Sequence, residues 1–370
     1  MNIETMLYIY LFVCAGMIVF NIITAVVLKH SDKKTTRISK KLLYEVNVQI
    51  DNIENGKEPD RSHKKYLYKK LKHISNMIAF DKMLENEYIA NPEVIREYLY
   101  HLDSVFIALT NNYCTGNIIE AAYFPYIIKK YRLIAYRPFP SIVGMLFDML
   151  EKPSIYCREN VLQALYTTGD ADCVIKAIKI IDRSTLFFHD KLLADGLLNF
   201  SGNLTELNNM LTEQFDSFSL KTKVALLNYL RFSTDKYKKF VFNLLCDDDN
   251  DSEIHYACIR YLGKYPFDKA YEKLCEFARE SSDNDWEYAA ISSSALSSYP
   301  GEKTVEILKN NLYSDNWYIR YNSAGSLKSL GLTYTNLADV IDGNDRYAAE
   351  ILRYRLENDN CEERSHSVVC

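Results

Sequence analysis

Two stretches of the chain, DNDWEYAAISSSAL at residues 283–296 and SDNWYIRYNSAGSL at residues 314–327, have nearly the same residue pattern. Each places a Trp after an Asn/Asp pair and before a run of small residues that ends in Leu, and the chain has no other Trp. The two final residues, Leu296 and Leu327, are 31 positions apart. A repeat of this size indicates a chain built from copies of one structural unit.

The same Leu position recurs upstream at a nearly constant spacing of 31 to 34 residues. The aligned positions are Leu133, Leu165, Leu198, Leu230, Leu262, Leu296 and Leu327. Within the units, an apolar stripe at helical spacing is followed by a turn and a second amphipathic stretch, as at 172–182, 237–246, 270–280 and 303–313. Each unit is therefore predicted to be a helical hairpin that begins with an Asp or Asn N-cap. One hairpin cannot bury its own apolar face, so the hairpins are predicted to stack around a continuous core.

This pattern resembles HEAT repeats of the short bacterial type over about residues 120–357. The residues that carry the resemblance are the Asp or Asn start, the Leu positions followed by Gly or Tyr-Pro, and the small residues Ala257, Ala289, Ala290, Ala324 and Gly325. The resemblance implies an all-α fold, a right-handed α-solenoid of helical hairpins. The low content of 12 Gly and 8 Pro in 370 residues also favours helix over sheet. Such a fold hosts many functions, so the resemblance specifies function poorly.

The N-terminal segment is predicted to be one transmembrane helix. Residues 6–28 carry no charge and as a helix measure about 34 Å, enough to cross the hydrocarbon core. Nothing basic precedes this run, which is also too long for a cleaved signal peptide. The cations follow it, as Lys29, Lys33, Lys34, Arg37, Lys40 and Lys41, which are predicted to lie at the membrane surface. The positive-inside bias places the N-terminus outside the plasma (inner) membrane and the remaining chain in the cytoplasm.

A basic neck is predicted over residues 29–90, between the anchor at 1–28 and a repeat domain at 91–357. Residues 29–80 hold 13 Lys and Arg against 6 Asp and Glu, whereas the whole chain has a net charge of -5. The neck is predicted to form one helix with an apolar stripe from Ile38 to Ile53, ended by Gly56 and Pro59, and a second from about Asp60 through Ile78. The acidic remainder argues against nucleic-acid binding. The tail, 358–370, is polar and predicted to be frayed.

Two clusters are predicted to bind a protein partner. The first surrounds the two Trp residues and contains Trp286, Tyr288, Trp317, Tyr318, Arg320 and Tyr321. Exposed aromatic and Arg side chains are typical of interface hot spots, although packing between repeats is the alternative role for the Trp pair. The second cluster is basic and aromatic and contains Lys129, Lys130, Arg132 and Arg137.

The sequence contains no motif for catalysis, a cofactor or a metal. Nine Cys occur without a Cys-x-x-Cys pair, and Asp247, Asp249 and Asp251 lack the Gly that an EF-hand loop requires. The chain is therefore predicted to be a non-enzymatic, membrane-anchored scaffold or adaptor for a membrane-associated protein partner, without a small-molecule substrate. Its layout resembles accessory partners of membrane machinery, and a glycosyltransferase or polysaccharide-export complex is one client implied. The alternative is a HEAT-fold enzyme, a lyase or DNA glycosylase, which a pocket with converging carboxylates would favour.

Overall fold

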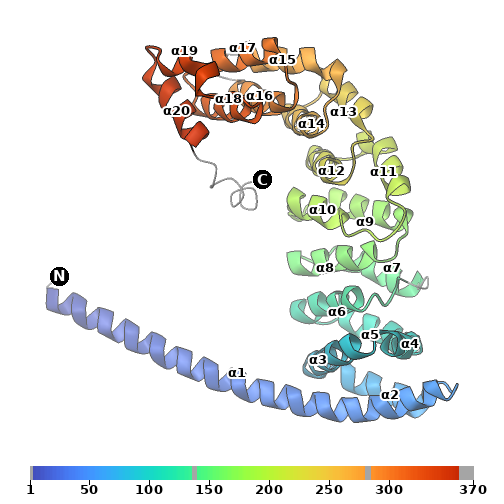
Figure 1. The fold of residues 1–370 in the computed structure, drawn as a ribbon. Helices are drawn as coiled ribbons and strands as arrows, with labels where there is room; N and C mark the ends of the chain where they lie inside the picture. The colour runs from blue at the N-terminus through green and yellow to red at the C-terminus, as the bar shows by residue number, and fades with distance from the viewer. Residues whose placement is uncertain (1–2, 136–139, 280–284, 358–370) are drawn as a thin grey trace. The chain divides into compact units, whose positions relative to one another are not determined.

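The structure, a computed structural model, describes residues 3–135, 140–279 and 285–357 (Figure 1). Throughout these ranges the regular structure is helical, with 20 α-helices, four 3₁₀ turns and no strand. Neighbouring helices along the chain pack against one another. The predicted all-α fold is therefore confirmed. The chain divides into two compact units, Met1–Ile181 and Asp182–Cys370. The predicted tail, 358–370, lies outside the described residues.

The first unit is made of helices α1 to α8 and most of α9. Their bounds are α1 (Ile3–Glu54), α2 (Arg61–Leu71), α3 (Ile74–Ala90), α4 (Pro92–Tyr100), α5 (Asp103–Cys114), α6 (Ile118–Lys130), α7 (Pro140–Met149), α8 (Ile155–Tyr166) and α9 (Ala171–Arg183). Helix α1 packs on α3 and α4, α2 packs on α5, α5 packs on α7, and α6 packs on α8. These contacts build the core of the unit from helices that are two or three positions apart in the chain.

Helix α1 covers both the predicted anchor and the first predicted helix of the neck. It runs for 52 residues without a break, because the chain has neither Gly nor Pro from Met17 to Asn55. Its C-terminal half buries Leu42, Val46 and Ile53, as the apolar stripe predicts. Its N-terminal half extends away from the rest of the unit (Figure 1, blue). The helix ends at Glu54, close to the predicted Gly56.

The second predicted neck helix is wrong in its extent, because it is two helices. His73 adopts an extended conformation between the end of α2 at Leu71 and the start of α3 at Ile74. The Tyr113 hydroxyl donates to the Leu71 carbonyl oxygen at 2.6 Å and so satisfies a group that continued helix would otherwise bond. After this change of direction Ile78 is 40% exposed, although the sequence stripe predicts it in the core.

The second unit contains helices in two alternating sets. Their bounds are α10 (Asp190–Leu197), α11 (Leu204–Glu213), α12 (Leu220–Ser233), α13 (Lys238–Leu245), α14 (Ser252–Lys264), α15 (Tyr271–Arg279), α16 (Trp286–Ala295), α17 (Glu302–Asn311), α18 (Trp317–Ser329), α19 (Ala338–Ile341) and α20 (Arg346–Glu357). From α10 to α20, each even-numbered helix packs on the next even-numbered one (Figure 1). Helices α13, α15, α17 and α19 each pack on the even-numbered helix that follows. Helices α13, α15 and α17 match three of the predicted second stretches within a few residues, and α9 matches the fourth.

The aligned Leu positions are mostly in the core. Five of them are no more than 1% exposed: Leu165, Leu230, Leu262, Leu296 and Leu327. Leu198 is 43% exposed, and the buried residue is its neighbour Leu197, so the predicted alignment is one residue late here. The reason is the short helix α10, which ends at Leu197 and leaves Leu198 as its C-cap. Leu133 is half-buried, beyond the end of α6.

The predicted Asp or Asn N-caps occur at some helix starts, whereas α8, α10 and α12 have Ser154, His189 and Ser219 at this position. Asp251 accepts from the Glu253 N–H at 2.9 Å at the start of α14, and Asn316 accepts from the Tyr318 N–H at 2.9 Å at the start of α18. Tyrosines provide a second set of such contacts. The Tyr299 hydroxyl donates to the Leu262 carbonyl at 2.9 Å and accepts from the Phe267 N–H at 3.1 Å. Tyr299 thus connects the segment after α16 to the end of α14 and to the segment that follows α14.

Candidate functional site

The two Trp residues occupy equivalent places in their helices but different environments. Trp286 is the first residue of α16 and is half-buried against Ala289, Ala290 and Ile319. Trp317 is the first residue of α18 and is 55% exposed. Trp286 therefore packs between α16 and α18, whereas Trp317 is a surface residue.

Tyr318 connects the two Trp rings. Its ring stacks on Trp286 with centroids 5.2 Å apart and an interplanar angle of 21°, and it meets Trp317 edge-on at 5.2 Å and 81°. The packing of α16 on α18 fixes this geometry. The Asn322 side-chain amide donates to the Ala290 carbonyl at 2.8 Å, so the N-terminal halves of the two helices are held side by side.

Two Arg residues lie over aromatic rings on the same side of α18. The Arg355 guanidinium, on α20, lies 4.4 Å from the Tyr321 ring centroid, and its Nη1 donates to the Tyr321 hydroxyl at 3.0 Å. Tyr321 also stacks on Trp317 at 4.7 Å. Arg320 lies 5.3 Å from the ring of Tyr347, and its Nε donates to the Ser314 carbonyl. Such cation–π contacts fix both partners.

The aromatic surface is defined here as seven residues from α16, α18 and α20: Trp286, Trp317, Tyr318, Arg320, Tyr321, Tyr347 and Arg355. Five of them were predicted from the sequence. Tyr347 and Arg355 were not, although the run RYAAEILRYR at 346–355 carries alternating Arg and Tyr that indicate a helix face of this kind. Both residues lie close to α18 because α20 packs on it, and a local sequence pattern does not predict this packing.

Tyr288 belongs to the interior instead. Its ring stacks on Phe277 at 4.7 Å, and its hydroxyl is 2.9 Å from Nδ1 of His255, which is itself buried. The Nε2 of His255 lies 3.0 Å from the Asp247 carbonyl oxygen. Tyr288 therefore packs α14, α15 and α16 together, and the structure does not place it with the aromatic surface.

The predicted basic cluster is not gathered on one surface. Lys130 forms an ion pair with the nearly buried Asp81 at 2.8 Å. Burial alone would lower the pKa of Lys130, but its hydrogen bond to Asp81 and the charge of that carboxylate outweigh burial and raise it. Lys129 is half-buried, Arg132 is exposed, and Arg137 lies outside the described residues. Lys130 is thus an interior partner of Asp81.

Two tyrosines complete what we call the Asp81 cluster, whose members are Asp81, Tyr123, Lys130 and Tyr131. The Tyr123 hydroxyl donates to Oδ2 of Asp81 at 2.8 Å, and the Tyr131 hydroxyl lies 2.7 Å from Oδ1. Burial, followed by the hydrogen bond to Asp81, raises the pKa of both tyrosines. The cluster connects α3 to the end of α6 through charge-assisted hydrogen bonds.

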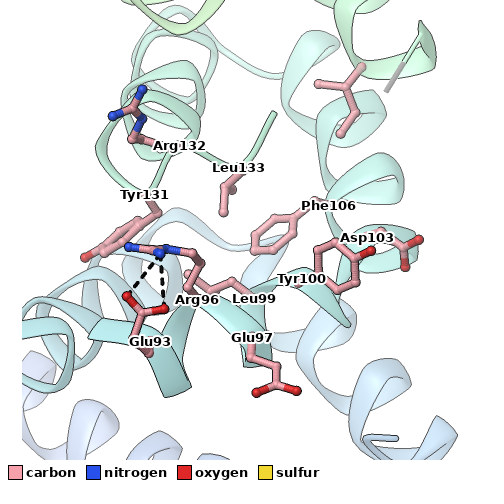
Figure 2. Close-up of a pocket in the computed structure, with 11 residues that line it drawn as sticks. Glu93, Arg96, Glu97, Leu99, Tyr100, Asp103, Phe106, Tyr131, Arg132 and Leu133 are labelled. Carbon is pink, nitrogen blue, oxygen red and sulfur yellow. Dashed lines mark hydrogen bonds and ion pairs between the residues drawn. The ribbon is translucent and has the colours of Figure 1, made fainter. Parts of the chain in front are cut away.

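A cavity of about 270 Å³ lies beside this cluster, between α4, α5, α7 and the turn after α6 (Figure 2). Three carboxylates line it. Glu93 is bound to the Arg96 guanidinium, with both carboxylate oxygens 3.2 Å from Nη1. Glu97 and Asp103 point away from one another (Figure 2). The carboxylates of this cavity therefore do not converge as paired acid/base catalysis requires.

The six basic residues after the apolar segment lie along α1. Lys29, Lys33, Lys34, Arg37, Lys40 and Lys41 are all exposed. With regard to metals, the described residues contain no group of three or more His, Cys, Asp and Glu placed to hold an ion.

In comparisons with known proteins, no family model matches the chain, and no curated protein sequence matches it. The functional interpretation therefore depends on the geometry of the chain itself.

Proposed function

We propose that this protein is a single-pass membrane protein whose helical units form a scaffold or adaptor for a membrane-associated protein partner. The finer description of the fold belongs to the same proposal: HEAT-like hairpins that wind into a right-handed α-solenoid. The observation that carries the proposal is α1, one helix with an exposed apolar half and a packed half. A membrane glycosyltransferase or polysaccharide-export complex is one client that would suit this layout.

The exposure of the apolar half supports membrane insertion. The helix is long and apolar enough to cross a bilayer, and none of its most apolar 18 residues is buried. A core helix of a soluble protein with this composition would be covered, because contiguous apolar surface in water favours association. A signal sequence shares the length and composition, but here the helix continues without interruption into residues that pack on α3 and α4. This continuity supports a retained anchor.

The orientation in the proposal depends on charge. The exposed cations at 29–41 directly follow the apolar half, against one acidic residue, Asp32, in the same span. Cationic flanks are retained on the cytoplasmic side and attract anionic headgroups. The helical units would then lie in the cytoplasm.

The anchor is tested on the full chain expressed in membranes. We expect the intact 43.0 kDa chain to remain in the membrane pellet after alkaline carbonate washing, and a variant without residues 1–28 to be released. Protease added to sealed, inside-out vesicles should digest the helical units. A mature chain whose mass shows cleavage after the apolar segment, or protection of the helical units in such vesicles, would contradict the proposal.

The aromatic surface supports a protein partner. Trp317 and Tyr318 are each 55% exposed and Tyr347 is 69% exposed, in the first turns of α18 and α20. Trp, Tyr and Arg side chains dominate interface hot spots, because rigid rings bury a large area with little loss of conformational freedom. The Arg contacts to Tyr321 and Tyr347 hold this surface in one arrangement before binding.

The two Trp residues make a matched pair of variants. We expect Trp317→Ala to lower partner recovery about tenfold or more with little change in stability, because its ring is exposed. We expect Trp286→Ala to reduce the free energy of unfolding by about 2–3 kcal/mol, because its ring packs on α16 and α18. Recovery is measured by crosslinking the full chain in membranes, and stability by chemical denaturation. Tyr313→Ala, which removes a 46% exposed ring from the turn after α17, is the control. Equal recovery with Trp317→Ala and Tyr313→Ala would exclude the aromatic surface as the partner site.

A further inference from the structure

Three helices of this chain end in the same hydrogen-bond pattern. After α1, the Gly56 N–H bonds to the Ile53 carbonyl and the Lys57 N–H to the Asn52 carbonyl. The same pair of bonds follows α18 at Gly331 and α6 at Arg132. This is the Schellman motif, in which the residue after the C-cap takes positive φ.

Arg132 is the exception among the three. Its φ is 50°, whereas the other two positions hold glycines at φ 71° and 81°. Positive φ places the Cβ of an L-residue against its own backbone, so Arg carries an energetic cost that Gly does not. An Arg at such a position points to a use for its side chain, since strained or locally disfavoured residues gather at functional sites.

The cavity shown in Figure 2 is next to this residue. Arg132 and Leu133 form one wall, and the buried side chains of Leu99, Phe106 and Ile142 form the others. The Arg132 guanidinium is directed away from Arg96 (Figure 2), so the part of Arg132 that lines the cavity is near its backbone and stem. An aliphatic stem with an outward charge is suited to covering an apolar wall. A Gly at this position would leave that wall open.

We propose that this cavity is a binding pocket for an apolar, ring-sized group that carries no negative charge. An apolar cavity of about 150 Å³ is large enough to hold benzene, and this one is about 270 Å³, which suits a bicyclic ring.

The charge of the lining disfavours an acidic ligand. Glu93, Glu97 and Asp103 line the cavity against Arg96 and Arg132, and Arg96 is already bound to Glu93. A carboxylate on the ligand would add a fourth negative charge. The ring itself is provided either by a free small molecule or by an aromatic side chain of a protein partner.

The pocket is tested by methyl NMR of the full chain in detergent micelles, with the Ile142 methyl group as reporter. Indole and tryptamine are expected to produce saturable shifts of Ile142 with half-saturation at about 1 mM, the range for such small ligands. Indole-3-acetate is expected to bind about tenfold more weakly. The methyl of Ile259, which is buried in the second unit, should not shift and so reports partitioning into micelles. N-acetyltryptophanamide, which presents the ring on a peptide backbone, binds more tightly than indole if a partner side chain is the source and more weakly if a free molecule is.

Three variants make the test specific. Leu133→Trp fills the cavity and should abolish the shift of the Ile142 methyl signal. Leu204→Trp, at a residue of α11 that is 45% exposed, should leave this shift unchanged. Arg132→Gly should weaken indole binding about fivefold, because the side chain that forms one wall of the cavity is lost. It should also raise the melting temperature by about 2 °C, because Gly adopts positive φ without strain. The proposal is overturned if neither indole nor tryptamine gives a saturable shift up to about 10 mM. It is equally overturned if Leu133→Trp binds as the unmodified chain does.

Discussion

Replacing Asp81 with Ala is expected to lower the free energy of unfolding of the first unit by about 3–5 kcal/mol. Asp81 is 9% exposed and receives hydrogen bonds from Lys130 at 2.8 Å, Tyr123 at 2.8 Å and Tyr131 at 2.7 Å. Without the carboxylate, a partly buried ammonium group and two hydroxyls lose their acceptor. Removing one partner of a buried charge costs far more than the net value of the pair.

Glu85 supplies the matched control for Asp81. Its carboxylate is 3.5 Å from the same Lys130 nitrogen, but its side chain is 57% exposed, so Glu85→Ala should cost less than about 1 kcal/mol. Asp81→Asn keeps an acceptor oxygen without the charge and should fall between the two. Hydrogen exchange over α3 and α6, combined with chemical denaturation of the full chain, measures each effect. Equal midpoints for Asp81→Ala and Glu85→Ala would show that the cluster contributes little.

Replacing Gly263 with Ala is expected to destabilise the second unit by about 2 kcal/mol, although Ala is the better helix former. A Cβ at residue 263 would lie 2.8 Å from the Ala295 Cβ and 2.9 Å from its Cα. Backbone atoms on the neighbouring helix cannot rotate away, so α14 and α16 must separate. The Ser298 hydroxyl, which donates to the Gly263 carbonyl at 2.6 Å, would be displaced with them.

At Gly144, the same Gly→Ala substitution is expected to increase stability. It lies in the middle of α7, is exposed, and has no atom within 4 Å of where a Cβ would be built. Gly144→Ala should therefore stabilise the first unit by about 1 kcal/mol through helix propensity alone. Denaturation curves and hydrogen exchange of both variants distinguish the two units. If Gly263→Ala is also stabilising, the close approach of α14 and α16 is not as tight as the structure shows.

The periodic features of the fold could be predicted from the sequence because they are local. The Leu spacing predicts the buried positions, and Asp and Asn residues predict helix starts, because both depend on neighbours within one or two turns. The failures have local reasons too. Leu198 falls outside a helix that is one residue shorter than the alignment assumes, and His73 interrupts a stripe that continues in the sequence.

The candidate site was less predictable because its contacts join distant parts of the chain. Lys130 looks like a surface cation in the sequence, yet its partner Asp81 is 49 residues away. Trp286 and Trp317 have matching local sequences, but only the packing of α16, α18 and α20 makes one half-buried and leaves the other exposed. The same packing brings Arg355 over Tyr321.

Because α1 is uninterrupted, a rotation of its apolar half about the helix axis also rotates its packed half. Each residue of an α-helix turns the chain by about 100° and advances it by about 1.5 Å. The helix has no break between its apolar half and Ser39, where packing begins. If α1 crosses a bilayer as proposed, its rotation about its own axis sets the direction in which α2–α8 face. An insertion of one residue between 29 and 38 would reorient those helices by more than a right angle, whereas seven residues would restore their phase to within about 20°. In the proposed membrane-inserted state, the direction in which α2–α8 face would therefore depend on the number of residues in α1 as well as on their chemistry.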